Sequence, residues 1–180
     1  HEPLTAEDRP RVVAIGDIHG AYDEFTRLLQ QVGLVDDRHR WSGGSAILVQ
    51  TGDVPDRGVQ VREVWDLLMT LERQADAAGG QVVALLGNHE TMNLVRQVRD
   101  VGPGAYASFA DGESEDRRQE AYQGYAKLSH DRIAALAHAP LNLQTEEEWM
   151  AAHPLGFVEY LEAIGPEGRY GRWLRSKPVV

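Results

Sequence analysis

The sequence predicts an α/β protein, because short apolar runs rich in branched residues alternate with segments of helical periodicity over its first half. Each apolar run ends in a Gly-Asp or Gly-Asn turn, as expected for strand–helix units of a parallel sheet. The chain has 180 residues, 42% of them hydrophobic, and a chain of this size buries roughly 70% of its unfolded surface. We therefore expect one domain, with a strand-bearing part at 9–95 and a helical insertion or cap at 96–170.

The first half predicts three strands and two long helices in alternation. Helices are indicated where apolar residues recur on one face, as Phe25, Leu28 and Leu29 do. The pair Gly79-Gly80 is typical of a helix end. The strands are nearly all apolar, which favours a parallel sheet covered on both faces. Strands are expected at 11–16, 46–51 and 81–86, and helices at 22–32 and 59–78.

The second half predicts helices and loops. Gly102-Pro103-Gly104 interrupts the chain, and the acidic stretch at 111–116 is expected to be a solvated loop or a helix start. Trp149, Tyr160 and their apolar neighbours are expected to form the core of this part rather than a cap that shapes the substrate. Helices are expected at 117–128, 129–137, 145–152 and 155–164.

The two ends of the chain and its charge limit the possible partners. The last residues, 178–180, are typical of the start of a buried strand, so we expect a single domain at 1–180 that is incomplete at its C-terminus. Lys and Arg number 18 against 28 Asp and Glu, a net charge of −10, so neither nucleic acid nor an anionic membrane is an expected partner. The absence of Cys excludes disulfides and thiolate chemistry. The compartment stays open: cytoplasmic, or periplasmic or secreted after removal of a leader.

Three turns, each directly after a predicted strand, hold the concentrated polar chemistry. The carboxyl ends of parallel strands meet at one edge of a sheet, where ligands bind. We therefore expect the side chains of the three turns to converge on one spot. The turns are Gly16-Asp17-Ile18-His19-Gly20, Gly52-Asp53-Val54-Pro55-Asp56-Arg57-Gly58 and Gly87-Asn88-His89-Glu90.

Four residues of these turns are candidate metal ligands: Asp17, His19, Asp53 and Asn88. Their oxygen and nitrogen donors are of intermediate hardness and suit Mn²⁺, Fe²⁺ or Zn²⁺. Two divalent metal ions fit better than one, because a bridging carboxylate would hold them ~3.5–4 Å apart and let them share and activate a water. Asp53, in the middle turn, is the expected bridge.

The remaining polar residues suit catalysis on a phosphate group. His89 and Asp56 form a natural pair in which the carboxylate orients the imidazole, so that His89 can donate a proton to a leaving oxygen. Arg57 supplies a planar fork for phosphate oxygens, and Asn88 and His89 are expected beside it at the phosphate. Glu90 is open to two interpretations, an acceptor that supports the site or an acid that stabilises a helix N-terminus.

The three turns resemble the opening motifs of the calcineurin-like metallophosphoesterases, and most closely those of the phosphoprotein phosphatase branch. The spellings Gly-Asp-x-x-Asp-Arg-Gly and Gly-Asn-His-Glu carry this assignment. Two outer stretches, Met92-Asn93-Leu94 and 171–178, are similar to the bacterial-type Shewanella-like phosphatases. The resemblance implies the first half of an α/β metallophosphoesterase-type β-sandwich flanked by helices.

The resemblance also implies roles for individual residues. It places Asp17, His19 and Asp53 on a first metal and begins the second site with Asp53 and Asn88, while Arg57, His89 and Asp56 keep the roles given above. The family completes the second site with two later histidines, in a Val-His-Gly-like turn and a Gly-His turn, and neither turn occurs in this sequence. A second metal site that is incomplete in this chain is therefore expected. His130, His138 and His153 could replace the missing ligands, but we expect them to be solvated or capping histidines instead.

The expected function is hydrolysis of a phosphomonoester by a hydroxide bound between the two metals, with Arg57 and the metals neutralising the phosphoryl charge. A phosphorylated substrate is the expected partner, either a small phosphoester or a phosphoprotein. A Ser/Thr or Tyr phosphoprotein follows only from the resemblance. Two alternatives stay open: a phosphodiesterase or dinucleoside polyphosphate hydrolase, and an inactive metal-binding module.

Overall fold

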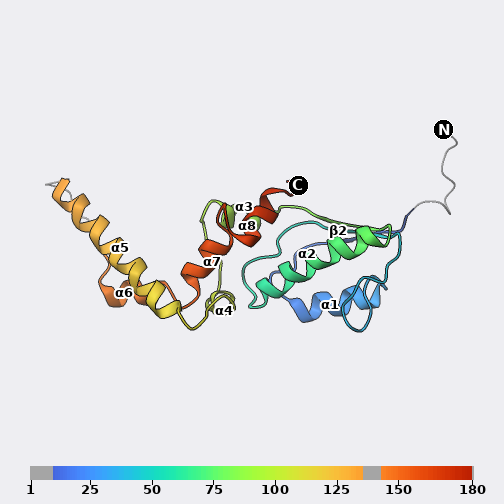
Figure 1. Cartoon of the computed structure of the whole chain (residues 1–180), viewed down its shortest axis with the longest axis horizontal. Coiled ribbons are helices and arrows are strands. Elements are labelled where there is room, and N and C mark those ends of the chain that lie inside the picture. The colour runs from blue at the N-terminus through green and yellow to red at the C-terminus, as the bar shows by residue number, and fades with distance from the viewer. Residues whose placement is uncertain (1–9, 136–142, 180) are drawn as a thin grey trace.

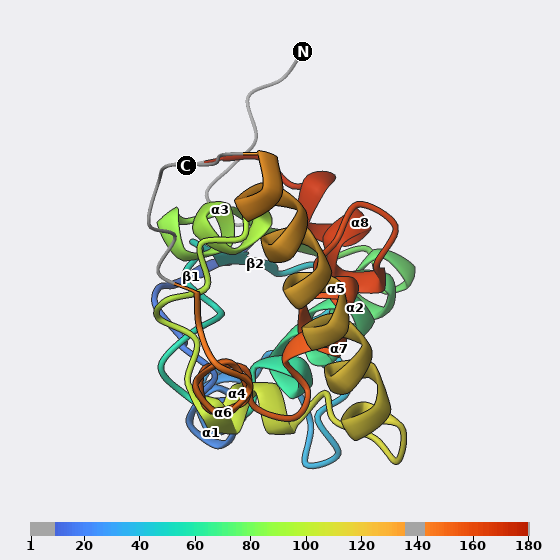
Figure 2. The same cartoon turned by 90° about the vertical axis from the view of Figure 1, so that its left-hand side faces the viewer.

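The computed structural model describes residues 10–135 and 143–179. The described part is elongated, with a small sheet and two helices at one end and a helical arm at the other (Figure 1). The arm consists of α5 (Ser114–Ala135) and α6 (Glu146–Ala152). Figure 2 views the molecule from the arm end, along the long axis of Figure 1. No helix among the described residues is both long enough and apolar enough to cross a bilayer.

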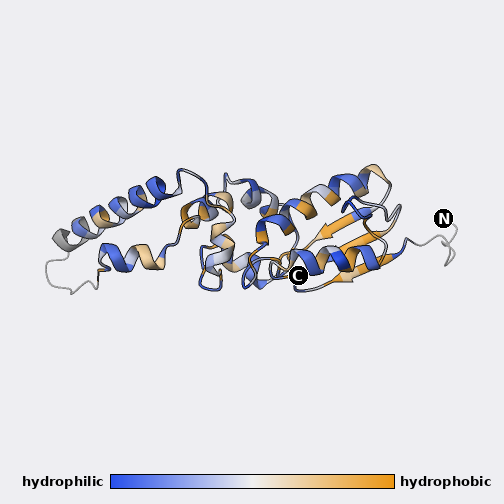
Figure 3. Ribbon diagram, turned by 90° about the horizontal axis from the view of Figure 1, so that it is seen from below, coloured by the Kyte–Doolittle hydropathy of each residue, from blue (hydrophilic) through white to orange (hydrophobic). Residues whose placement is uncertain are grey.

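The sheet has three parallel strands in the order β1-β2-β3, as the alternating pattern predicts. The register pairs Val12 with Ile47 and Ile47 with Gln81. Figure 3 shows the strands as a strongly hydrophobic block beside helices with mixed surfaces. The strands are β1 (Val12–Ile15), β2 (Ile47–Gln50) and β3 (Gln81–Ala84), connected through α1 (Tyr22–Gln31) and α2 (Val61–Ala77).

One face of the sheet is fully covered and the other is not. Leu48 and Val82 lie on the covered face, where α1 and α2 contact each other and α2 packs along β3. On the opposite face Val12 is 59% exposed and Ala14 is also exposed. The expectation that both faces are covered is therefore wrong for the described residues, because both connecting helices pack on the same side.

The second half is helical, and it differs from the sequence prediction in one joined helix and in three helices that were not predicted. α5 is one continuous helix where two were predicted, because neither Leu128 nor Ser129, at the predicted junction, interrupts a helix. α3 (Asn88–Leu94), α4 (Pro103–Ala107) and α8 (Arg169–Arg175) are short helices that were not predicted. α4 begins at Pro103, within the Gly102-Pro103-Gly104 stretch that was expected to interrupt the chain, because proline fits the first turn of a helix. α8 follows the turn Gly165-Pro166. The remaining helix is α7 (Phe157–Ala163).

An aromatic cluster joins the sheet end of the molecule to the helices. Trp65 of α2 lies 6.3 Å from Tyr160 of α7 and 5.1 Å from Tyr170 of α8, measured between ring centroids. Phe109 contacts both tyrosines edge-on, at 5.0 and 5.8 Å. All four rings are buried, so the apolar residues of the second half form core, as expected for Tyr160, and they share it with α2.

The C-terminal segment returns to the sheet end. The Leu86 N–H donates to the Pro178 carbonyl at 2.8 Å, and Val179 pairs with Leu86 in a single parallel bridge. The predicted strand is therefore present as one bridge. Its predicted burial is wrong for Val179, which is 70% exposed.

Candidate active site

Backbone hydrogen bonds hold the first two turns together. The Ile18 and His19 N–H groups both donate to the Asp53 carbonyl at 3.0 Å, and the Gly20 N–H donates to the Val54 carbonyl at 2.9 Å. Backbones this close leave no room for side chains between the turns, and a Cβ on Gly58 would overlap the His19 carbonyl oxygen. Glycine at this position is therefore a condition for the close approach.

His19 presents an unshared ring nitrogen to the centre of the site. Its Nδ1 lies 2.9 Å from the Pro55 carbonyl oxygen, and because a carbonyl can only accept, Nδ1 carries the proton. Nε2 is then the unprotonated nitrogen, and it is buried without a hydrogen-bond partner. A buried lone pair without a partner is costly unless a cation or a proton donor occupies the space before it.

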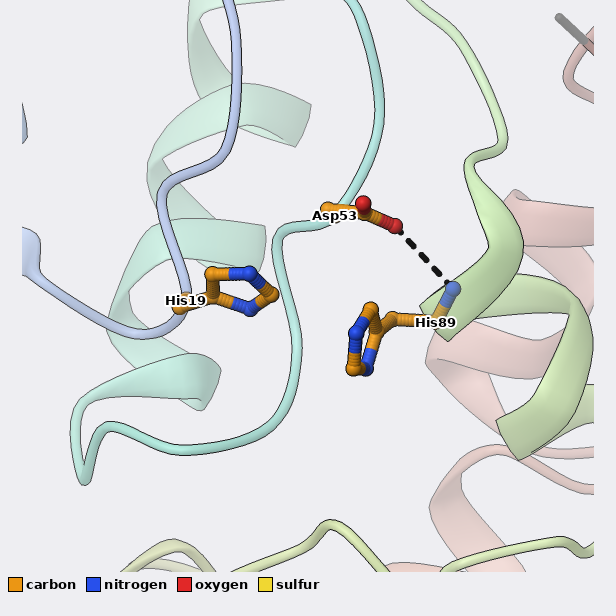
Figure 4. Close-up of side chains that lie close together, drawn as sticks. All are labelled: His19, Asp53 and His89. Atoms are coloured by element: carbon orange, nitrogen blue, oxygen red, sulfur yellow. Dashed lines mark hydrogen bonds between the residues drawn. The ribbon is translucent and has the colours of Figure 1, made fainter.

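Asp53 and His89 complete the group around His19. The ligand atoms of His19, Asp53 and His89 lie within 4.8 Å of one another, and Figure 4 shows the three side chains converging from separate turns. Asp53 Oδ1 accepts the His89 backbone N–H at 3.0 Å, which ties the middle turn to the third. The two imidazoles meet edge-on, with centroids 4.8 Å apart.

The other two predicted metal ligands lie at the rim of this group. Asp17 is largely exposed, and its Oδ2 lies 3.8 Å from His19 Nε2. Asn88 is the exposed first residue of α3, directly before His89. The structure thus brings His19 and Asp53 into one group with His89, with Asp17 beside His19 and Asn88 next to His89 in the chain.

The donor set fits a divalent metal ion. Imidazole nitrogen together with carboxylate oxygen suits Mn²⁺, Fe²⁺ or Zn²⁺, and Nε2 of His19 is the unprotonated nitrogen that a metal needs, with no hydrogen-bond partner. His19 and Asp53 would hold such an ion, with Asp17 within reach of the same ring nitrogen. The Pro55 carbonyl plays the supporting role that fixes the ligand tautomer.

His89 and Asp56 form a buried pair beside the metal-ligand group. His89 Nδ1 lies 2.6 Å from Asp56 Oδ2, with the carboxylate fully buried and the imidazole nearly so. The far nitrogen, Nε2, lies 3.4 Å from Nη2 of Arg57, whose side chain reaches in from the exposed end of the middle turn. One face of the site therefore carries an oriented imidazole next to a guanidinium.

Glu90 is the acceptor that braces the site. It is 1% exposed, and its Oε2 accepts the N–H groups of Asp53 and Gly87, both at 2.8 Å, while Oε1 accepts that of Val54 at 2.7 Å. Burial raises the pKa of Glu90, and these N–H donors oppose that rise. Glu90 also lies in the first turn of α3, so the two interpretations left open by the sequence describe one residue with both properties.

Several site residues have left-handed backbone conformations. The φ angles are 48° at His19, 59° at Asp53, 71° at Asp56 and 63° at Arg57. Such conformations cost non-glycine residues on the order of 1–3 kcal/mol each and concentrate at functional sites. Among the described residues, six non-glycine residues have such φ angles, and four of them lie in this site; the other two are His39 and Arg96.

Two residues named in the sequence analysis without a role at the site support it, Asn93 and Tyr160. Asn93 donates from Nδ2 to both carboxylate oxygens of Asp56, at 3.0 and 3.1 Å. Tyr160 donates its hydroxyl to Asn93 Oδ1 at 2.7 Å. Asn93 could have been found, since it follows His89 by one helical turn. Nothing in the sequence places Tyr160 of α7 beside α3.

The histidines considered as replacement ligands lie away from this group. His153 stacks on Trp149 at 4.0 Å and bonds the Trp149 carbonyl, at the end of α6. His130 lies on α5, and His138 lies outside the described residues. Among the described residues, neither His130 nor His153 joins a cluster that could hold a metal.

The fold and the site are those of an α/β protein of the metallophosphoesterase class. More particularly, the family model of calcineurin-like phosphoesterases matches residues 10–166, and the chain belongs to this family.

Two of the three relatives described next carry phosphatase names, in agreement with the narrower resemblance. The chain is 45% identical over 108 residues to an uncharacterized protein of Schizosaccharomyces pombe, covering 59% of this chain and 32% of that one. It is 42% identical over 95 residues to Shewanella-like protein phosphatase 2 of Arabidopsis thaliana, covering 53% and 24%. The crystal structure of the cold-active protein-tyrosine phosphatase of a psychrophilic Shewanella is similar at 32% identity with a TM-score of 0.58, over 92% of this chain and 37% of that one. The chain thus spans about a quarter to two fifths of these proteins.

Proposed function

We propose that this chain carries the metal, phosphate and proton-donor residues of a metal-dependent phosphomonoesterase, a protein phosphatase that acts on phosphorylated Ser, Thr or Tyr. The observation that supports it most directly is the convergence of His19, Asp53 and His89 at the ends of parallel strands. Their order along the chain matches the family motifs, and relatives carry phosphatase names.

The proposed metal site uses Asp17, His19, Asp53 and Asn88, with Asp53 as the bridge between two ions. Divalent ions there would neutralise the phosphoryl oxygens and activate the attacking water. The second ion needs ligands beyond those of the described residues, in agreement with the share of its relatives that this chain spans.

Arg57 and His89 are the side chains that act directly on the substrate in the proposed reaction. The Arg57 fork binds two phosphate oxygens and thereby leaves His89 Nε2, which it now faces at 3.4 Å. Once Arg57 has left, Nε2 takes up a proton from solvent, and the buried Asp56 carboxylate stabilises the resulting imidazolium. His89 then gives this proton to the leaving oxygen as the bond from phosphorus to that oxygen breaks and the attacking water oxygen bonds to phosphorus.

The test is p-nitrophenyl phosphate hydrolysis by residues 1–180 with added Mn²⁺, with Asp53→Asn as the paired variant. Metal-dependent turnover that falls at least a hundredfold in Asp53→Asn is the expected result, because the variant loses the carboxylate proposed to hold both metal ions, which activate the water and neutralise the phosphoryl oxygens. Wild-type turnover that is equal with Mn²⁺ and with a chelator would contradict the proposal.

Companion substrates separate the alternative functions. Faster turnover of bis(p-nitrophenyl) phosphate or a diadenosine polyphosphate than of the monoester would favour the phosphodiesterase or dinucleoside polyphosphate hydrolase. Metal uptake without turnover would favour the inactive metal-binding module. Phosphoserine and phosphotyrosine peptides of one sequence then establish which phosphoprotein is preferred.

A further inference from the structure

A chain of buried hydrogen bonds runs from α7 to the imidazole of His89. The Tyr160 hydroxyl donates to Asn93 Oδ1 at 2.7 Å. Asn93 Nδ2 donates to both oxygens of Asp56, at 3.0 and 3.1 Å, and to the His89 carbonyl at 2.9 Å. Asp56 Oδ2 lies 2.6 Å from His89 Nδ1. A residue of the helical part is thus linked to the proposed acid through two side chains.

Every member of this chain is shielded from solvent. Tyr160, Asn93 and Asp56 are 0% exposed or nearly so, and His89 is 6% exposed. Water therefore has no free access to replace a lost partner. Removing one partner would leave the other buried without a hydrogen bond, at the full cost of its desolvation. Each member of the chain therefore keeps its neighbours in position.

The direction of each bond is fixed by the chemistry of the groups. Asn93 must point Nδ2 at Asp56, because the reverse orientation would set its amide oxygen against a carboxylate. The orientation in turn requires a donor at Oδ1, and Tyr160 supplies it. Burial and the neighbouring Asp56 carboxylate raise the pKa of Tyr160 well above its ordinary value, which keeps the hydroxyl protonated as a donor.

We propose that Tyr160, acting through Asn93, is a positioning residue that fixes the Asp56–His89 pair in the geometry for proton transfer to the leaving oxygen. This inference rests on the proposed function for its kinetic consequence, but its structural content does not need turnover. The helical part is on this account a component of the active site, since α7 delivers the hydroxyl that orients the acid.

Tyr160→Phe is the informative variant, because it removes one oxygen and keeps the ring against Trp65 and Phe109. Tyr170→Phe is its matched control. Tyr170 packs on the same two rings, and its hydroxyl also donates to one acceptor, Asp66 Oδ1 at 2.9 Å, away from the site. The two variants lose the same atom from the same cluster.

The first readout is the His89 Nδ1 proton in the metal-free chain, observed by ¹H NMR and identified by its absence in His89→Asn. In Tyr160→Phe we expect this proton to exchange with water about tenfold faster, the effect of one lost hydrogen bond. In Tyr170→Phe we expect the wild-type rate. Equal rates in wild type and Tyr160→Phe would overturn the proposal.

The second readout is the dependence of kcat on the leaving group. Phenyl phosphate needs proton donation more than p-nitrophenyl phosphate does, because p-nitrophenolate is the better leaving group. For Tyr160→Phe we expect kcat to fall about tenfold on phenyl phosphate and no more than about twofold on p-nitrophenyl phosphate, with KM unchanged. A structural defect would lower both rates alike, and that result would refute the positioning role.

A double-mutant cycle tests the route through Asn93. In the Asn93→Ser background, Tyr160→Phe is expected to have no further effect on the exchange rate, because the intervening amide is gone. Additive effects would mean that Tyr160 acts by another path and would overturn the inference. Should the variants fail to fold, a nuclear Overhauser effect between the Asn93 amide and His89 Nδ1 protons in the unaltered chain decides the matter, and its absence would contradict the chain of bonds.

The two readouts keep this inference separate from the proposed function. Faster exchange in Tyr160→Phe without turnover in the wild type would support the positioning chain and contradict the proposed activity of residues 1–180. Metal-dependent turnover in the wild type, with the exchange rate and the leaving-group dependence unchanged in Tyr160→Phe, would support the proposed activity and contradict the positioning chain.

Discussion

Glu90→Gln is the most direct test of how the three turns are held together. The wild-type carboxylate accepts three backbone N–H groups, those of Asp53 and Gly87 at Oε2 and that of Val54 at Oε1. A glutamine can keep its oxygen at the Oε2 position and so retain two of the three bonds. Its NH₂ group then faces the Val54 N–H, donor against donor, in a place that is 1% exposed.

The expected loss of stability follows from two opposed effects. A buried N–H left without an acceptor costs about 1–3 kcal/mol, and the two retained bonds weaken because the acceptor is no longer charged. Removing the buried charge offsets part of this cost, since burial raises the pKa of Glu90. The unsatisfied donor dominates, and we expect the free energy of unfolding to fall by about 2 kcal/mol.

Urea unfolding followed by circular dichroism measures this change. With a urea m-value of about 2 kcal/mol/M, the midpoint should fall by about 1 M. The control is Glu120→Gln, since Glu120 lies exposed on α5, and it should leave the midpoint within about 0.2 M. A Glu90→Gln midpoint as high as that of the control would refute the bracing role of the carboxylate.

Two further predictions concern the close approach of the turns and the join between α5 and α7. Gly58→Ala should lower the free energy of unfolding by about 1–3 kcal/mol, because the added methyl group overlaps the His19 carbonyl. Gly112→Ala is the control, since Gly112 has open space around it and the change should leave the free energy of unfolding unaltered. Equal urea midpoints for the two variants would contradict this prediction. Burial alone raises the pKa of Glu159, but hydrogen bonds, including that from Arg117 at 2.7 Å, hold the pKa below its ordinary value. The stability from this group is therefore present above the unfolded pKa and is lost as pH falls through the folded pKa. In Glu159→Gln the urea midpoint should change less between pH 5 and about pH 3 than in the wild type. The same change of midpoint with pH in both proteins would count against the ion pair.

The sheet end of the fold could be predicted because its signals are local. Apolar runs, helical periodicity and Gly-Asp turns each lie within one short segment, so the strands and the helices α1 and α2 occur where the sequence predicts them. In the helical part, the prediction divided α5 into two helices and did not include α8. α8 depends on packing, because it is held by Tyr170 and Leu174 in the shared core rather than by a strong periodic pattern of its own. α5 is continuous because neither residue at 128–129 interrupts a helix.

The candidate site was predictable to the extent that its residues lie in three consecutive motifs. The Asp56–His89 distance and the orientation of His19 follow from turns that meet at the end of a parallel sheet, a placement that topology determines. The contact between Tyr160 and Asn93 joins residues 67 positions apart. No local pattern specifies which helix of the second half lies against α3, so this part of the site required the structure.

At Arg57, backbone strain allows the effect of a substitution on stability to be separated from its effect on function. Its φ of 63° costs a non-glycine residue about 1–2 kcal/mol, and glycine would remove that cost while losing about 0.4–1 kcal/mol to the entropy of the unfolded chain. Arg57→Gly should therefore be about 1 kcal/mol more stable than Arg57→Ala. Both variants lose the guanidinium that is proposed to bind phosphate, so their kcat/KM values should be equally low. A glycine variant no more stable than the alanine variant in urea would mean that the turn imposes no strain at this position, and the conformation would then carry no argument for function.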